Sequence, residues 1–151
     1  MTMTDREHAV EVAIAHMESL LEWDRTLDTF GTMTPDELDH EARNEDNDED
    51  VRSLASRMAK ELADGGLDEL SWSSFMSDAL DVEITGTLVQ GRWELSGVAL
   101  LVGFGGPTVR YVAVDDSTIR VEVSWWGDSA ERTVDVGLAG ELWAYAEAVA
   151  P

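Results

Sequence analysis

The chain has 151 residues, of which 44% are hydrophobic, and this is enough to build one domain with a buried core. Its 32 acidic and 10 basic residues give a net charge of −22, and no lysine- or arginine-rich patch is present to bind nucleic acid directly. The lack of cysteine excludes disulfide bonds, thiolate nucleophiles and cysteine-ligated metals.

The acidic excess has two interpretations. Self-repulsion destabilises a folded chain of this charge unless salt screens it, and at molar salt the Debye length falls to about 3 Å. An acidic surface with a single lysine, Lys60, is therefore typical of a protein from the salt-rich cytoplasm of a halophile. The alternative is a mimic of the phosphate charge of DNA, which would inhibit a DNA-binding enzyme as anti-restriction proteins do.

The first twenty residues carry acids within their apolar pattern and lack the apolar core of a signal peptide. No apolar run approaches the ~18 residues that a membrane-spanning helix needs. We therefore expect a cytoplasmic protein that does not associate with a membrane.

Residues 1–80 form the predicted helical half. A first helix is expected from Asp5 to about Thr26. Its predicted core stripe follows helical spacing and comprises Val10, Ile14, Met17 and Leu21, widened by Ala9, Ala13 and Leu20. Thr34 and Glu37 form a capping box at the start of a second helix. Five acids among residues 44–50 predict a break or a mobile loop.

Helical spacing resumes at Val51 and ends at Gly65-Gly66, and a short helix is expected within residues 67–80. From Asp81 the apolar period becomes two, which predicts a four-stranded antiparallel meander over residues 81–127. A C-terminal helix is predicted over residues 135–150. Asp135 is its expected cap, and its apolar stripe comprises Leu138, Leu142, Tyr145 and Val149.

The register of two hairpins can be predicted, because in each hairpin one register places apolar residues on one face and polar residues on the other. With a turn at Gln90-Gly91, Leu88 lies opposite Trp93 and Ile84 opposite Gly97. With a three-residue connection at 115–117, the central strands pair apolar with apolar residues: Val109 with Val123, Tyr111 with Val121 and Ala113 with Ile119. The same register pairs Arg110 with Glu122, Pro107 with Trp125 and Gly106 with Trp126.

That register brings two segments together at one end of the sheet, and we call Gly105–Pro107 and Trp125–Gly127 the Gly/Trp corner. One interpretation is a shallow site with an aromatic floor and exposed backbone amides, which contacts a ligand or a partner. The predicted contact residues are Gly105, Gly106, Pro107, Arg110, Trp125 and Trp126. The other interpretation is packing, in which the glycines make room for an indole ring and permit the turn.

No catalytic residue, metal site or cofactor is predicted. Asp46, Asp48 and Asp50 alternate like the start of a calcium loop, but Val51 and Arg57 stand where that loop needs glycine and glutamate. The histidines lack a ligand spacing and are expected to be ordinary surface residues: His8, His16 and His40.

The segment LLVGFGGPTVRYVAVDDSTIRVEVSWWGDSAE resembles small uncharacterised proteins of bacteria and mobile elements, in which a strand runs into Gly-Gly-Pro and a later strand ends in Trp-Gly or Trp-Trp-Gly. The resemblance covers about the last seventy residues, and the Gly/Trp corner carries it. The chain departs from the pattern at Thr108-Val109-Arg110, where an asparagine and an aromatic are expected. The resemblance implies an α+β fold and an accessory role, and it implies no reaction.

The expected fold is therefore a single α+β domain, residues 1–151, with N-terminal helices packed on the meander. The leading hypothesis is a non-enzymatic protein-interaction protein of a halophile, with a virus or plasmid as one source of its gene. Its partner would be an unknown protein, and its assembly state a monomer or a small homo-oligomer. The alternatives are the DNA mimic and a binder of a small ligand at the Gly/Trp corner.

Overall fold

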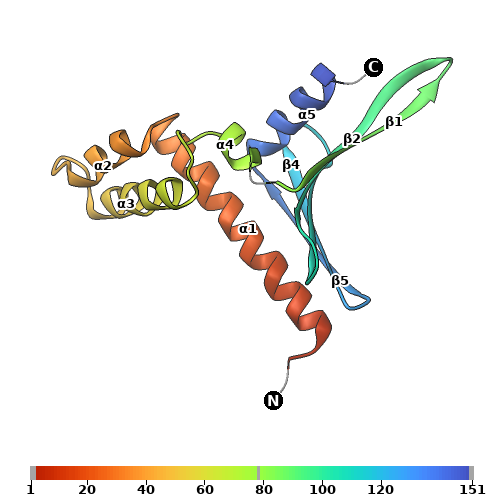
Figure 1. Cartoon of the computed structure of the whole chain (residues 1–151), viewed down its shortest axis with the longest axis horizontal. Coiled ribbons are helices and arrows are strands. Elements are labelled where there is room, and N and C mark those ends of the chain that lie inside the picture. Colours follow the sequence, from red (N-terminus) through yellow and green to blue (C-terminus); the bar gives the residue numbers. More distant parts are fainter. Residues whose placement is uncertain (1–2, 78, 150–151) are drawn as a thin grey trace. The chain divides into compact units, whose positions relative to one another are not determined.

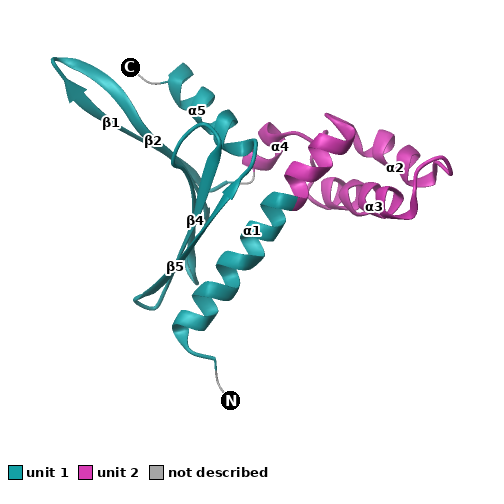
Figure 2. Cartoon of the chain, turned by 180° about the vertical axis from the view of Figure 1, so that it is seen from behind, with its two compact units in different colours: residues 1–21, 78–151 teal, residues 22–77 magenta. Residues whose placement is uncertain are grey.

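The computed structural model describes residues 3–77 and 79–149, which adopt an α+β fold. The helices are α1 (Asp5–Phe30), α2 (Pro35–Arg43), α3 (Glu49–Asp64), α4 (Trp72–Ser77) and α5 (Leu138–Val149) (Figure 1). The strands are β1 (Asp81–Val89), β2 (Arg92–Gly103), β3 (Thr108–Ala113), β4 (Thr118–Trp125) and β5 (Asp128–Asp135). The chain divides into two compact units, residues 1–21 with 78–151 and residues 22–77, which Figure 2 colours separately.

The unit of residues 22–77 is helical, and its boundaries follow the predicted caps. The Thr34 hydroxyl accepts from the Glu37 backbone N–H, and the Glu37 carboxylate accepts from the Thr34 N–H, so the capping box is confirmed. The acidic run breaks the helix as expected, and Asn47 fastens the loop by donating to the Glu41 backbone carbonyl and carboxylate. Asp48 then caps α3.

Aromatic rings and aliphatic side chains form the core of this unit. The Phe75 ring lies edge-on to Trp23 and Trp72, with centroid separations of 5.2 and 5.4 Å. Leu38, Leu62 and Leu70 are fully buried beside them. The serine-rich segment 71–77 therefore contributes two aromatic side chains to this unit even though its helix is short.

The other unit is built on an antiparallel sheet in the order β1-β2-β3-β4-β5, so the described chain has five strands where four were predicted. β5 pairs with β4 along its whole length, from Asp128 opposite Trp125 to Asp135 opposite Thr118. The sequence indicated at most a short strand around Thr133-Val134, because Arg132 interrupts the alternating pattern between two buried residues, Ala130 and Val134. The Asp135 carboxylate accepts from the Thr118 hydroxyl at the end of β5, so Asp135 is a strand residue rather than the cap of α5.

The β3–β4 register is the predicted one, with Val109, Tyr111 and Ala113 opposite Val123, Val121 and Ile119. The β1–β2 register is correct only next to the turn, where Leu88 faces Trp93 and Gly86 faces Leu95. A bulge then leaves Ser96 out of the register, with its hydroxyl donating to the Thr85 carbonyl, and Ile84 faces Val98 instead of Gly97. The bulge turns the larger side chain, that of Val98, into the core, where it is 2% exposed.

One face of the sheet is buried, because the inward residues of β3 and β4 are 0–3% exposed. The opposite face carries half-exposed charged side chains, including Arg110 and Glu122, and faces solvent. The helices α5 and the first half of α1 therefore cover the apolar face. On α1 the buried face is Ala9, Ala13 and Leu20, which are 0% exposed, because alanines let a helix approach a sheet closely.

The predicted apolar stripes of both helices were thus partly wrong. On α1, Val10, Ile14 and Met17 are only half-buried and Leu21 is exposed. On α5 the buried residues are Leu138, Ala139, Leu142 and Ala146, while Tyr145 and Val149 face solvent. In both helices alanines and leucines share the buried face, whereas periodicity alone gave more weight to the larger side chains.

Candidate contact site at one end of the sheet

The Gly/Trp corner exists as two neighbouring connections in the unit that contains the sheet. Residues 104–107 connect β2 to β3, and Trp126-Gly127 forms a two-residue turn between β4 and β5. A methyl group placed on Gly106 would lie 3.7 Å from the Trp125 ring, so Gly106 lies next to Trp125 and not next to Trp126, its predicted register partner. Trp126 is in the turn and does not face Gly106 in the register.

Trp126 has an unusual backbone conformation. Its φ is +49° and that of Gly127 is +90°, the pair of positive values that a type I′ hairpin turn requires. Asparagine and glycine are the residues that favour this conformation, and a bulky side chain there is a genuine outlier. The Trp126 side chain is nevertheless 82% exposed, so burial of its indole does not offset the strain.

Phe104 is the second exposed aromatic residue of this region, with 77% of its surface accessible. It directly precedes Gly105, whose φ is +100°. Sequence reasoning did not single out Phe104, although it is the last apolar residue of a run that continues past the end of β2. The region therefore presents two large aromatic side chains from two separate loops of one sheet end.

Trp125 forms the base under these loops. Its ring stacks on the His8 imidazole from α1, with a centroid separation of 5.5 Å and an interplanar angle of 28°. The Trp126 ring meets it edge-on at 6.5 Å. His8 is exposed, as predicted for a surface histidine, but it anchors the start of α1 against the corner.

The environment of His16 differs from the surface position predicted for it. It is half-buried, and its Nδ1 forms a hydrogen bond with the Tyr111 hydroxyl. Burial lowers the pKa of His16 and raises the pKa of Tyr111, so both groups are favoured in their neutral forms at this hydrogen bond. This contact fastens α1 to the middle of the sheet and holds the helix start beside Trp125.

Arg110 does not join the corner. Its side chain lies on the solvent-facing side of the sheet, with Nε 3.1 Å from the Glu83 carboxylate. Glu122 is its register partner, but the Glu122 carboxylate instead pairs with Arg120 at 2.7 Å. The predicted contact set therefore splits into five residues at the sheet end and one residue on the open face.

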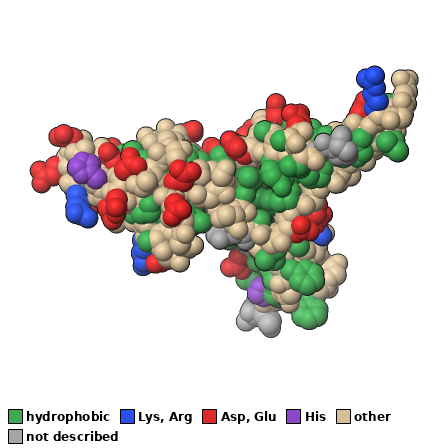
Figure 3. Space-filling model, turned by 45° about the horizontal axis from the view of Figure 1, so that its top comes forward, with side chains coloured by type: hydrophobic (Ala, Val, Ile, Leu, Met, Phe, Trp, Pro, Cys, Tyr) green, Lys and Arg blue, Asp and Glu red, His purple; other side chains and the backbone are tan. Residues whose placement is uncertain are grey.

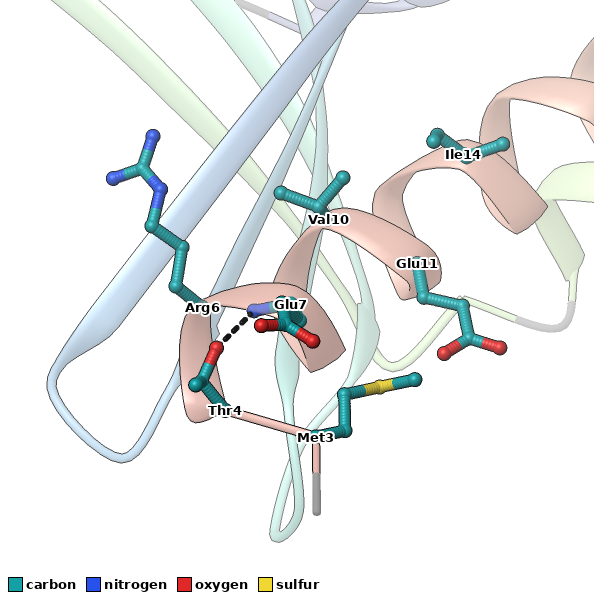
Figure 4. Close-up of a pocket in the computed structure, with 7 residues that line it drawn as sticks. All are labelled: Met3, Thr4, Arg6, Glu7, Val10, Glu11 and Ile14. Carbon is teal, nitrogen blue, oxygen red and sulfur yellow. Dashed lines mark hydrogen bonds between the residues drawn. The ribbon is translucent and has the colours of Figure 1, made fainter. Parts of the chain in front are cut away.

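A shallow groove of about 570 Å³ lies on the surface of the first turns of α1, and its lining residues all come from residues 3–14 (Figure 4). Val10 and Ile14 form its apolar wall, and Met3 lies beside them. The Thr4 hydroxyl accepts from the Glu7 backbone N–H and caps the helix there. Two residues of the predicted core stripe, Val10 and Ile14, therefore line a groove on the surface.

No protein-family model matches the chain, and neither a curated protein nor a solved structure matches it. Within residues 3–77 and 79–149, no cluster of three or more histidine, aspartate or glutamate side chains is arranged to hold a metal ion. The described helices include none that is both long and apolar enough to cross a membrane.

Proposed function

We propose that this is a non-enzymatic protein-interaction protein of a halophile, and that Phe104 and Trp126 contact its partner. The observation that carries the proposal is the exposed Trp126 side chain on a left-handed backbone. A strained backbone at a bulky, exposed residue supports a contact role, because packing within the fold does not offset the strain. Aromatic side chains are also the commonest anchors of protein interfaces.

The corner is built to present these anchors rather than to enclose a small substrate. Trp125 is held between His8 and Trp126, and β4 continues through the turn into β5 without interruption. Such a base limits the motion of the loops, so little side-chain entropy is lost when a partner binds. Phe104 and Trp126 can then enter apolar pockets of a second protein.

The charge distribution supports adaptation to salt. Residues 22–77 hold 16 acids and 5 bases, and the remaining 95 residues also hold 16 acids and 5 bases. Each unit therefore carries a net charge of −11, and carboxylates are visible on both in Figure 3. A coat of this kind hydrates the whole surface, and molar salt screens its repulsion. The resemblance to mobile-element proteins, carried by the same corner, favours an accessory role.

Capture of partners from a lysate of the host cell at molar KCl tests the proposal. The wild-type chain is compared with the double variant Phe104→Ser/Trp126→Asn and with Tyr145→Ser, which removes an exposed aromatic residue from α5. We expect a protein that binds the wild type and Tyr145→Ser but not the corner variant. Identical binding by all three chains would contradict the role of the corner.

The DNA mimic remains a second candidate because of one local feature. Residues 36–50 contain nine acids and one arginine, and eight of these acids are exposed. A dense acidic segment is what a mimic of the phosphate backbone needs. Competition between duplex DNA and this protein for the captured partner would separate the two functions, since only a mimic is displaced by DNA.

A further inference from the structure

The two edges of the sheet differ in how they are protected from pairing with another strand. β5 carries charged residues along its length: Asp128, Glu131, Arg132 and Asp135. β1 has its only charges at its first and third positions, Asp81 and Glu83, and the six residues from Ile84 to Val89 are uncharged and free of proline. Long uncharged edges without lysine or proline are sites of strand addition, and natural proteins usually block them.

The same edge belongs to a two-stranded arm, residues 85–97, which extends past the other strands (Figure 1). β3 pairs with β2 only from Val98 onward, so within the described chain the arm has no third strand. Leu88 is 76% exposed and Val89 is 43% exposed. Isolated two-stranded hairpins are marginally stable in water, so this arm gains most from a further strand.

The charge of the arm indicates what that strand is. The arm contains one acid, Glu94, and one base, Arg92, in a chain whose net charge is −22. Two copies of this protein repel each other over most of their surface, and the neutral arm is where they can approach at the lowest electrostatic cost. A second copy also offers an identical edge strand, which is the condition for a two-fold symmetric interface.

We propose that β1 pairs antiparallel with β1 of a second copy, with the two-fold axis at Thr85. This register matches all nine residues of the strand. It places Val82 opposite Leu88 and Ile84 opposite Gly86, so apolar residues meet apolar residues on one face. On the other face Thr85 meets Thr85, and Glu83 meets Thr87.

The proposed register also brings opposite charges of the two copies near each other. Asp81 of one copy lies opposite Val89 of the other, and the register partner of Val89 within its own hairpin is Arg92. The acid and the arginine therefore lie on one face, one strand apart, at both ends of the symmetric pair. Both sheets join into one continuous sheet, and the edge that lacks protection disappears from each copy.

The absence of cysteine makes a direct test available, because a single introduced thiol reports only its own surroundings. Thr85→Cys places two thiols face to face across the proposed axis, within the distance that a disulfide spans. Thr133→Cys is the matched control, an exposed threonine on the other edge strand, β5. Thr87→Cys tests the register, since its proposed neighbour is Glu83 rather than a second thiol.

At molar KCl we expect light scattering to give the mass of two chains for the wild type. Under mild oxidation Thr85→Cys should form a covalent dimer about tenfold faster than Thr133→Cys or Thr87→Cys. A wild-type mass of one chain across the micromolar range would overturn the proposal. Equal oxidation rates for Thr85→Cys and Thr133→Cys, with circular dichroism showing that both are folded, would overturn it as well.

Discussion

The Tyr111 hydroxyl and Nδ1 of His16 form a hydrogen bond, and this contact joins the middle of α1 to the third strand of the sheet. Desolvation lowers the pKa of His16 from its usual value of 6.5, so the ring is neutral in the folded protein. Protonation would place a charge on this half-buried ring. The contact therefore links the stability of this unit to pH.

We predict that His16 lowers stability as pH falls from 6.5 toward its folded pKa, because the unfolded chain binds the proton first. Above 6.5 the contribution is fully present. Urea unfolding midpoints of the wild type and His16→Gln, measured across this pH range at constant KCl, check the prediction. The midpoint difference between the two proteins should shrink in acid, and a constant difference would show that His16 does not titrate in this way.

Substitution of the two adjacent tryptophans, Trp125 and Trp126, should change the free energy of unfolding in different ways. Trp126→Asn relieves the left-handed backbone strain and loses little burial, so stability should stay unchanged or rise by up to about 1 kcal/mol. Trp125→Ala removes the ring that stacks on His8 and should cost about 2 kcal/mol. Urea unfolding monitored by circular dichroism measures both. A loss of more than 1 kcal/mol in Trp126→Asn would mean that this indole serves packing.

The arm contains a matched pair of glycines. A methyl group on Gly86 would overlap the Trp93 ring, so Gly86→Ala should cost about 1–3 kcal/mol. A methyl group on Gly97 meets nothing within 4 Å, and Gly97→Ala should leave stability unchanged or raise it by up to about 1 kcal/mol. Equal unfolding midpoints for the two variants would show that Trp93 does not lie on Gly86.

The sequence predicted the strand pairing well where side-chain size and charge alternate without exception. Val109, Tyr111, Val121 and Val123 share one face, as the register required. The predicted β1–β2 pairing is wrong beyond Ser96, because the bulge there adds one residue to β2 and the alternation of apolar and polar residues does not reveal it. The strand β5 was not predicted in full for a different reason, because Arg132 lies on the inward side of the strand and interrupts its apolar alternation.

The candidate site could be predicted only in part. The Gly-Gly-Pro motif and the β3–β4 register correctly predicted that these glycines meet the end of β4, but Gly106 lies next to Trp125 and not next to the predicted Trp126. The exposure of Phe104 and the left-handed turn at Trp126 depend on where β2 ends and on the existence of β5. Neither follows from apolar periodicity, since hydrophobic residues beyond a strand end look the same whether they pack or protrude.

Salt dependence tests the interpretation of the charge. With each unit at a net charge of −11, we predict that the chain loses folded structure in dilute buffer and regains it as KCl approaches molar concentrations. Far-ultraviolet circular dichroism against KCl measures this. Full folding in dilute buffer, with no change on adding KCl, would remove the argument for a halophile and favour the DNA mimic.

The central claim is that the exposed aromatic residues Phe104 and Trp126 touch another protein. Its most direct test replaces Trp126 with a photoreactive phenylalanine analogue in the host cell, and Tyr145 in a parallel strain. The account predicts a light-dependent adduct of defined mass from position 126, with a protein other than this chain, and none from position 145. The same adducts from both positions, or none from position 126 in folded protein, would contradict it.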